Sequence, residues 1–465
     1  MEFPFQNTYA ALPDSFHEKG SPTPVLHPFL IAANDRLASE LDLDPADLRT
    51  PEALAIFAGN AIPAGAEPIA MAYAGHQFGN FVPRLGDGRA ILLGEVKGRD
   101  LQLKGAGQTP FSRRGDGRSA LGPVLREYLV SEAMHALGIP TTRALMAVGT
   151  GEFVLREEPE KGGILTRVAT SHLRIGTVQY FAGRHDLASL QKLVDYANQR
   201  LYPANENALD LLRSVIAKQA RLIAQWMSVG FIHGVMNTDN MSLSGETIDY
   251  GPCAFMDHFN PAQKYSFIDQ GGRYAYQNQP GIAQWNLVRL AEALLPLLDP
   301  DQDRAVELAK AELEKIPALY ESHHLEIFAG KLGHPSGIAP SLLQDLLDLM
   351  AAQRADFTLT FRGLGRSPDA FLAQFSDGPP ARAWLARWQA LGPADLPLMN
   401  SMNPAFIPRN HRIEEVIAAA QNDDFTPFHQ LHQILSRPYQ EQAGSERYEH
   451  PPRPEEVVCA TFCGT

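Results

Sequence analysis

A polar segment, His233–Asn240, places the strongest constraint on the fold of this chain. It follows directly on Ala208–Phe231, whose apolar residues recur at helical spacing, and it is followed nine residues after Asn240 by Asp249-Tyr250-Gly251. A long amphipathic helix therefore leads into a loop of hydrogen-bonding side chains, and the chain must turn back tightly before Asp249. Loops of this kind, held by a rigid helix, commonly carry functional residues.

The residues between Asn240 and Asp249 predict a β-hairpin. Met241–Leu243 and Thr247–Ile248 have the character of short strands, and Ser244-Gly245-Glu246 suits the turn between them. Paired strands would bring the two ends within about 5 Å of each other. The amide oxygen of Asn240 and the carboxylate of Asp249 could then share Mg²⁺, or Mn²⁺, which accepts similar oxygen ligands. The alternative is that these residues only form the turn.

The same segment resembles a protein-kinase catalytic loop that lacks one group. A kinase loop of the form His-x-Asp-x-x-x-x-Asn places its catalytic Asp five residues before the Asn. Val235 occupies that position, so the hydroxyl-activating carboxylate is absent there. Asp239 is the candidate general base in its place, and the alternative is that it caps a turn.

The N-terminal half predicts strands around a glycine-rich turn. Gly86-Asp87-Gly88-Arg89 precedes a strand over Ala90–Val96, and a second strand covers Leu101–Lys104. The backbone of such a turn can approach a phosphate closely because glycine has no Cβ, although glycine-rich hairpin turns are also common without this role.

Lys104 at the end of its strand predicts an ion pair, because a lysine there is costly unless a carboxylate accompanies it. Leu121–Leu137 is the next predicted helix, and it carries two candidates, Glu127 and Glu132. A strand lysine paired with a helix glutamate is how kinases hold nucleotide phosphates. The alternative is a surface lysine and an unrelated helical glutamate.

Together these elements predict an α+β chain with a protein-kinase-like, two-lobed fold. We expect residues 1–180 to form an N-terminal extension and a β-rich, nucleotide-binding N-lobe. Residues 181–465 would form a mostly helical, extended C-lobe with the catalytic loop, the metal site and an extended tail from Ser436. Beyond the elements above, helices are predicted over Pro28–Leu41, Ile282–Leu298, Asp303–Leu319, Ser341–Arg362, Ala381–Leu391 and Ile413–Gln421, and strands over Thr142–Val148, Phe153–Arg156 and Gly163–Val168.

Composition excludes several classes of function. The formal net charge of −13 argues against a general nucleic-acid-binding surface. No apolar run approaches the roughly 20 residues that span a bilayer, and the first residues lack the pattern of a signal peptide. Three cysteines do not form a disulfide framework in a chain of 465 residues. We therefore expect a cytoplasmic protein without membrane or nucleic-acid partners, with a monomer as the default.

Five long segments in the same order resemble the selenoprotein O family, pseudokinases that act as protein adenylyltransferases. The resemblance extends from about Tyr73 to Cys463, nearly the whole chain. The segments are YAGHQFGNFVPRLGDGRA, LQLKGAGQTPFSRRGDGRSAL, RVATSHLRIGTVQYF, FIHGVMNTDNMSLSGETIDYGPCAFMD and NPAFIPRN.

This resemblance implies a role for each matching position. The implied site comprises the ion pair of Lys104 and Glu127, the glycine-rich loop with Gly86, Gly88 and Arg89, a pocket for an inverted ATP with Asp116, Gly117, Arg167 and Arg174, the magnesium ligands Asn240 and Asp249, and the proton acceptor Asp239. An inverted ATP would present its α-phosphorus to a Ser, Thr or Tyr hydroxyl of a target protein. AMP would be transferred and pyrophosphate would leave, so a base at the Val235 position would serve no purpose.

Two other functions stay open. One is a phosphotransferase in which Asp239 replaces the missing loop carboxylate, and the other is a catalytically silent pseudokinase scaffold that binds nucleotide. We interpret His76 as structural.

The cysteines predict a redox switch. The family keeps a thiol near the C-terminus, and this chain has Cys459 and Cys463 there. A disulfide between Cys253 and Cys463 would hold the tail beside the metal site, and Cys459 is a further candidate partner. The alternative is three unrelated thiols.

Overall fold

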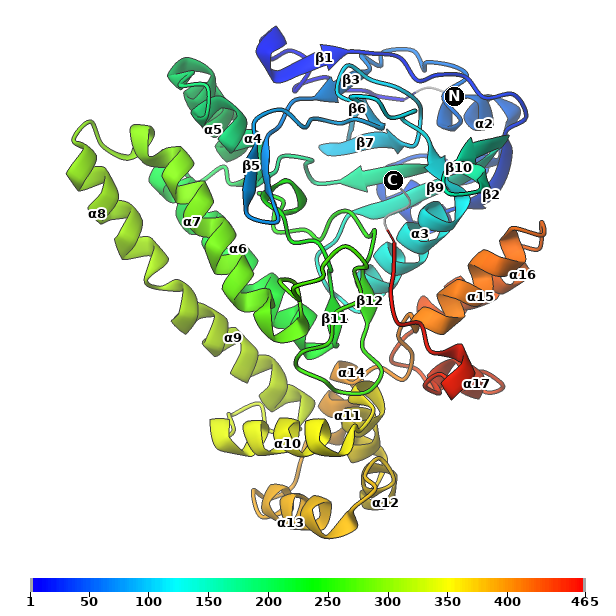
Figure 1. The fold of residues 1–465 in the computed structure, drawn as a ribbon, viewed down its shortest axis with the longest axis vertical. Helices are drawn as coiled ribbons and strands as arrows, with labels where there is room; N and C mark the ends of the chain where they lie inside the picture. The colour runs from blue at the N-terminus through cyan, green and yellow to red at the C-terminus, as the bar shows by residue number, and fades with distance from the viewer. Residues whose placement is uncertain (1–2, 463–465) are drawn as a thin grey trace.

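The fold, obtained as a computed structural model that describes residues 3–462, is of the α+β class (Figure 1). One end of the molecule is built around a β-sheet, and helices form the rest. This agrees with the predicted order of strands followed by helices. Within residues 3–462, no helix is both long and apolar enough to cross a membrane.

The central sheet has eight strands in the order β1-β3-β6-β7-β10-β9-β2, with β8 paired to β10. Neighbouring strands within it pair in the antiparallel sense. Separate two-stranded ribbons are formed by β4 with β5 and by β11 with β12. The strands are β1 (His17–Lys19), β2 (Phe29–Ala33), β3 (Ile69–Met71), β4 (Gly75–Gln77), β5 (Asn80–Val82), β6 (Ala90–Val96), β7 (Arg99–Lys104), β8 (Ser119–Ala120), β9 (Arg143–Leu155), β10 (Pro159–Ala169), β11 (Phe231–Ile232) and β12 (Ala254–Phe255).

The two faces of the sheet bury different cores. On β7, Leu101 and Leu103 point into a core shared with the short helices α1 (Asp35–Glu40) and α2 (Pro51–Phe57). The alternate residues Gln102 and Lys104 face the other way, since side chains alternate across a strand. On that side α3 (Leu121–Ala136) packs against β9 and β10, and its apolar core continues without a break into the helical part of the chain. Polar side chains at the ends of these strands therefore lie between sheet and helices.

Fourteen further helices follow α3 along the described chain. They are α4 (Ile175–Ala182), α5 (Leu187–Leu201), α6 (Ala208–Ser228), α7 (Gln279–Leu298), α8 (Gln302–Leu313), α9 (Ile316–Lys331), α10 (Pro340–Gln353), α11 (Phe357–Arg366), α12 (Pro368–Leu372), α13 (Gly378–Gln389), α14 (Leu396–Met402), α15 (Asn410–Ala420), α16 (Thr426–Leu435) and α17 (Glu446–Glu449). Helix α6 packs along α7 and α9, while α15 and α16 return to contact α3.

The helix predicted over Pro28–Leu41 is wrong in its first half. Phe29–Ala33 is strand β2, paired with β9, and only Asp35–Glu40 is helical. Asn34 ends the strand and caps the helix, because its side-chain oxygen accepts the Leu37 N–H at 3.0 Å. A short apolar run cannot be assigned to helix or strand from its periodicity alone.

Two other predicted helices are each divided. Asp303–Leu319 contains all of α8 except its first residue, and then the start of α9, which has Pro317 in its first turn. Ser341–Arg362 is interrupted at Arg354, whose φ of +53° ends α10, after which Asp356 caps α11. Conversely, Thr142–Val148 and Phe153–Arg156 belong largely to one long strand, β9.

The hairpin predicted between Asn240 and Asp249 is also wrong. Ser242 pairs with Arg174 and Thr247 pairs with Thr141, so the two expected strands bond to other parts of the chain. The backbone groups of Leu243 and Thr247 are satisfied by Leu173 and Pro140 respectively. A two-stranded hairpin of this length is weak by itself, and neighbouring backbone competes with it successfully.

Candidate active site

The predicted ion pair of Lys104 is present, and its partner is Glu127. The Lys104 Nζ lies 2.5 Å from Glu127 Oε2, and both side chains are largely buried. Glu132, one and a half turns further along α3, pairs instead with Arg143 at 2.8 Å. Burial raises the pKa of Glu127, but the charges of Arg167 and Lys104 outweigh this and hold it below its usual value. Glu127 is therefore an ionised anchor for two cations.

Arg167 reaches the same point from the neighbouring strand. On β10 it lies opposite Gln102, and Leu165 lies opposite Lys104. Arg167 and Lys104 therefore share one face of the sheet, two residues apart along the strands. Arg167 Nη2 is 2.6 Å from Glu127 Oε1, and only 2% of the arginine side chain is exposed.

Asp249 joins this group from the loop that follows the polar segment His233–Asn240. Its Oδ1 lies 3.0 Å from Lys104 Nζ and 2.6 Å from Arg167 Nη2, and its Oδ2 lies 2.9 Å from Arg174 Nη1. Burial opposes ionisation, but the charges of Arg167, Lys104 and Arg174 hold the pKa of Asp249 well below its usual range. The Asp249 side chain is 22% exposed to solvent, so an incoming ligand can reach it.

We call these five residues the inner cluster: Lys104, Glu127, Arg167, Arg174 and Asp249. Arg174 connects the two segments that the predicted hairpin was expected to connect. Its Nη1 donates to the carbonyl oxygen of Asp239 at 2.7 Å and also to the carboxylate of Asp249. It thereby holds the two ends of the predicted hairpin together. Asp249 itself adopts a φ of +64°, a conformation that aspartate tolerates better than most residues.

Asp239 is buried beside the inner cluster but lies outside its ion pairs. Its side chain accepts one hydrogen bond, from Gln77 Nε2 to Oδ2 at 3.4 Å, and Oδ1 has no hydrogen-bond partner within residues 3–462. Burial raises the pKa of Asp239 to about 6, against the lowering effect of Arg174. A buried carboxylate oxygen without a partner is rare in folded proteins and suits a group that receives a proton or a ligand.

Asn240 and Asp249 offer oxygen atoms for a cation. The amide nitrogen of Asn240 donates to the carbonyl oxygen of Val235 at 3.0 Å, which directs the amide oxygen elsewhere. Oxygen donors are those that Mg²⁺ and Mn²⁺ prefer. Within the described residues, no group of three or more His, Cys, Asp or Glu side chains could hold a metal by itself. The metal site of Asn240 and Asp249 stays a prediction, and its donors fit a cation completed by phosphate oxygens.

The glycine-rich loop packs tightly on Phe111. Gly86 has a φ of +72°, and a Cβ there would collide with the Phe111 ring. The carbonyl oxygen of Gly88 accepts a hydrogen bond from the Ser112 hydroxyl. Arg89 Nη1 is buried and has no hydrogen-bond partner within residues 3–462. The loop thus has a defined shape and leaves one guanidinium nitrogen available.

Asp116 and Gly117 are not brought into the inner cluster. Asp116 pairs with Arg156 at 2.9 Å and is 45% exposed. The carbonyl oxygen of Gly117 accepts the Gly107 N–H at 3.0 Å, and its φ is +67°. These contacts shape the loop that follows β7, and the role of Asp116 and Gly117 in a nucleotide pocket stays a prediction.

Two buried residues were missed by the sequence analysis. Asp87 is 2% exposed and lies 3.8 Å from Arg174. Gln102 links it to the cluster, since its amide nitrogen donates to Asp87 at 3.0 Å and its oxygen accepts from Arg167 at 3.3 Å. Its position two residues before Lys104 on the same face of a strand was the available signal.

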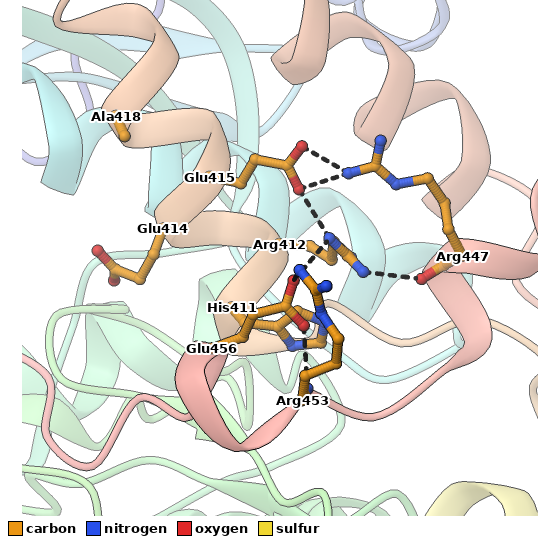
Figure 2. A pocket seen from close by; sticks show the side chains of 8 residues that line it. All are labelled: His411, Arg412, Glu414, Glu415, Ala418, Arg447, Arg453 and Glu456. Carbon is orange, nitrogen blue, oxygen red and sulfur yellow. Dashed lines mark hydrogen bonds and ion pairs between the residues drawn. The ribbon is translucent and has the colours of Figure 1, made fainter.

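A cavity lies away from the inner cluster, between α15 and the tail (Figure 2). It has a volume of about 590 Å³. Guanidinium and carboxylate groups alternate along its wall, and most of them are partly exposed. We call the following residues the outer network: Arg412, Glu415, Arg447, Arg453 and Glu456. Each of these side chains forms an ion pair with another member of the network, and these pairs join the tail to α15.

The tail continues from the outer network to the vicinity of Cys253. The hydroxyl of Thr461 donates to the carbonyl oxygen of Pro252 at 2.6 Å, and the backbone of Thr461 pairs with Ser266. Cys253 is buried and Cys459 is exposed. Cys463 lies outside the described residues, so its disulfide with Cys253 stays a prediction, to be checked by whether a reducing agent raises activity.

Comparison with known proteins shows the family to which the chain belongs. The family described as "Protein adenylyltransferase SelO" matches residues 1–436. A "Protein nucleotidyltransferase YdiU" of Bradyrhizobium sp. (strain BTAi1 / ATCC BAA-1182) is 57% identical, over 100% of both chains. Proteins of the same name are 55% identical in Bradyrhizobium diazoefficiens, over 100% of both chains, and 54% identical in Rhizobium meliloti (strain 1021), over 100% of this chain and 99% of the relative.

Proposed function

We propose that this chain, which belongs to the SelO family of protein adenylyltransferases and is a nucleotidyltransferase, transfers AMP from ATP to Ser, Thr or Tyr hydroxyls of target proteins. The observation that carries the proposal is the inner cluster beside Asp239, which combines buried cations with a carboxylate oxygen that has no partner. A reaction that moves a nucleotidyl group needs cations for the phosphates and an acceptor for the hydroxyl proton.

The cations of the inner cluster would bind the phosphates of ATP. Lys104 and Arg167 now divide their charge between Glu127 and Asp249. When ATP enters, its phosphate oxygens would replace part of this contact, while Glu127 keeps both cations oriented. Guanidinium groups bind phosphate oxygens through two parallel hydrogen bonds, and they would stabilise the leaving pyrophosphate.

The nucleotide would be inverted relative to a kinase, with the α-phosphorus towards the acceptor hydroxyl. The resemblance to the family implies this orientation, and it is supported by Val235, which offers no base at the kinase position, and by Asp239, which offers one elsewhere. Gly86, Gly88 and Arg89 would line the path of the phosphates, with Asp116 and Gly117 at the outer end of the pocket. The whole chain would be a protein-kinase-like fold of two lobes, divided near residue 180.

Asp239 would take the proton of the acceptor hydroxyl. Its Oδ1 has no hydrogen bond to give up, and Gln77 and Arg174 fix the position of its segment. Carboxylates buried in this manner act as bases near neutral pH because burial raises their affinity for a proton.

Asn240 and Asp249 would hold Mg²⁺, or Mn²⁺, when the nucleotide is bound. Such a cation neutralises phosphate charge and orients the α-phosphate. Arg174, which contacts Asp249 and the carbonyl of Asp239, would keep these two segments in register during binding. We place the enzyme in the cytoplasm and expect it to act as a monomer.

The test uses ATP labelled on the α-phosphate in one incubation and on the γ-phosphate in another. Label retained on protein only from the α position supports AMP transfer. Label only from the γ position would make the chain a phosphotransferase that uses Asp239. Nucleotide binding without label from either position would leave a scaffold and refute the proposal.

A further inference from the structure

The ribbon of β4 and β5 lies over the segment that contains Asp239. The N–H of His76 donates to the Thr238 hydroxyl at 2.7 Å, and the N–H of Phe78 donates to Asn237 Oδ1 at 3.0 Å. Gly75 lies so close to Asp239 that a Cβ at this position would collide with the carboxylate. In Figure 1 this blue ribbon extends from the sheet towards the green helical part of the chain. The ribbon therefore forms one side of the surroundings of Asp239.

Two arginine side chains and the His76 ring of the same ribbon pack around Trp285. The guanidinium carbons of Arg273 and Arg289 lie 5.0 Å and 4.9 Å from the centre of the Trp285 ring. The His76 ring meets Trp285 edge-on at 5.3 Å, and Phe81 on β5 is 41% exposed. Arginine and aromatic residues are enriched where proteins bind one another.

Arg273 forms no ion pair with a carboxylate anywhere in residues 3–462, and its Nε is buried without a hydrogen-bond partner. Arg289 pairs with Glu292 at 2.6 Å, yet its Nε is likewise without a partner. Most other half-buried arginines of this chain have a carboxylate partner. A half-buried cation without a counter-ion is unfavourable unless an anion joins it from outside.

The ribbon also sets the distance between this stack and Asp239. Gln77 contacts Asp239, and the Cβ position of Gly79 is 3.8 Å from the Arg273 guanidinium. Gln77 and Gly79 belong to the tight turn that joins β4 and β5, so they lie closer together than the roughly 7 Å that two residues of extended chain span. A peptide lying along the ribbon with its hydroxyl at Asp239 would therefore place a side chain two or three residues away at Arg273.

We propose that the ribbon of β4 and β5, together with Arg273, Trp285 and Arg289, is the docking surface for the acceptor protein. It selects hydroxyls that have Asp or Glu two or three residues away. This inference rests on the proposed protein adenylylation. The unpaired charge of Arg273 and the exposed Phe81 together favour an acidic segment with an apolar neighbour over a basic one.

The experiment uses peptides with one acceptor hydroxyl and Glu, Gln or Lys placed two and three residues to either side. Each is made in Ser, Thr and Tyr versions and incubated with ATP labelled on the α-phosphate. We expect kcat/KM to be about fivefold higher for the Glu peptide than for the Gln peptide, the upper range for an accessible ion pair. The preference should shrink as salt rises to 0.5 M, because salt screens such pairs.

Charge reversal gives the decisive comparison. Arg273→Glu should make the Lys peptide the best substrate and the Glu peptide the worst, with ATP binding unchanged. Arg289→Gln, a milder change on the other face of Trp285, should reduce the preference for Glu without reversing it. Arg304→Glu, on the exposed surface of α8, is the matched control and should keep the wild-type order.

Equal rates for the three peptides with the wild-type enzyme would overturn the docking surface. So would an Arg273→Glu enzyme that slows all peptides equally, since that is the result of a purely structural role. Self-labelling of the enzyme without labelling of any peptide also counts against it. Absence of label from the α-phosphate on every protein and peptide would instead refute the proposed adenylylation itself.

Discussion

The inner cluster and the outer network contain the same kinds of side chain in different surroundings. In the inner cluster the Arg167 side chain is 2% exposed, whereas in the outer network that of Arg447 is 52% exposed. Buried charges lose hydration and depend on one another, while exposed pairs are screened by water and salt. The difference teaches that a dense set of ion pairs marks a functional site only where burial makes each partner indispensable.

The two regions also differ in what they leave unsatisfied. In the outer network each guanidinium and each carboxylate takes part in an ion pair, as Figure 2 shows, and Arg412 Nε, on a guanidinium that is already paired, is buried without a hydrogen-bond partner in residues 3–462. Beside the inner cluster, Asp239 Oδ1 and Arg89 Nη1 are buried without partners in the described chain. Ligands bind where the protein has not already satisfied its own polar groups.

The largest effect is expected for Asp249→Asn. This change keeps the size of the side chain and removes the charge that Lys104, Arg167 and Arg174 share. We expect AMP transfer to fall by at least about 1000-fold, because both phosphate orientation and the proposed cation site depend on this carboxylate. The measurement is label transfer from α-labelled ATP at saturating nucleotide. Activity within tenfold of wild type would remove Asp249 from the site.

Asp239→Asn should lower the rate by about 100-fold, the usual contribution of a general base. Nucleotide affinity should stay within about threefold, because Asp239 forms no ion pair with the cations of the inner cluster. Isothermal titration calorimetry with ATP measures the nucleotide affinity, and single-turnover label transfer measures the rate of the chemical step. A variant that loses ATP binding and transfer together would instead make Asp239 a structural residue.

The burial of Asp239 also predicts a pH effect on stability without metal or nucleotide. A carboxyl whose folded pKa is raised from 3.8 to about 6 favours the folded state below its unfolded pKa and loses that contribution as pH rises through 6. In EDTA, Asp239→Asn should therefore gain stability over wild type between pH 4 and pH 8, by about 2–3 kcal/mol. Urea unfolding at the two pH values measures this gain. A constant difference between the proteins would show that the carboxyl is ionised throughout.

The smallest effect is expected in the outer network. Glu415→Gln removes the carboxylate that Arg412 and Arg447 share, at 2.9 Å and 2.5 Å. Since the carboxylate is 41% exposed, screening by water should keep the loss of stability below about 1 kcal/mol, with transfer unchanged within twofold. Thermal melting measures the change in stability, and label transfer from α-labelled ATP measures the activity. A loss of transfer activity as large as that expected for Asp249→Asn would show that the two regions do not differ in function.

Much of the site could be predicted from local sequence. The strand that ends at Lys104, the helix that carries Glu127 and the long helix before His233 all follow from residue spacing, and the structure confirms these elements. The absence of a carboxylate at Val235 is likewise a property of the sequence alone. Such features depend on residues a few positions apart, and their periodicity reflects one strand or one turn of helix.

The tertiary structure decided which of these residues meet. It chose Glu127 over Glu132 for Lys104, directed Asp116 to Arg156, and added Asp87 and Gln102 to the buried polar group. It also replaced the predicted hairpin with contacts to Arg174 and Thr141, because backbone groups pair with whichever partner the whole fold brings near. Periodicity along the chain determines which way a side chain points, but the packing of distant segments determines what it finds there.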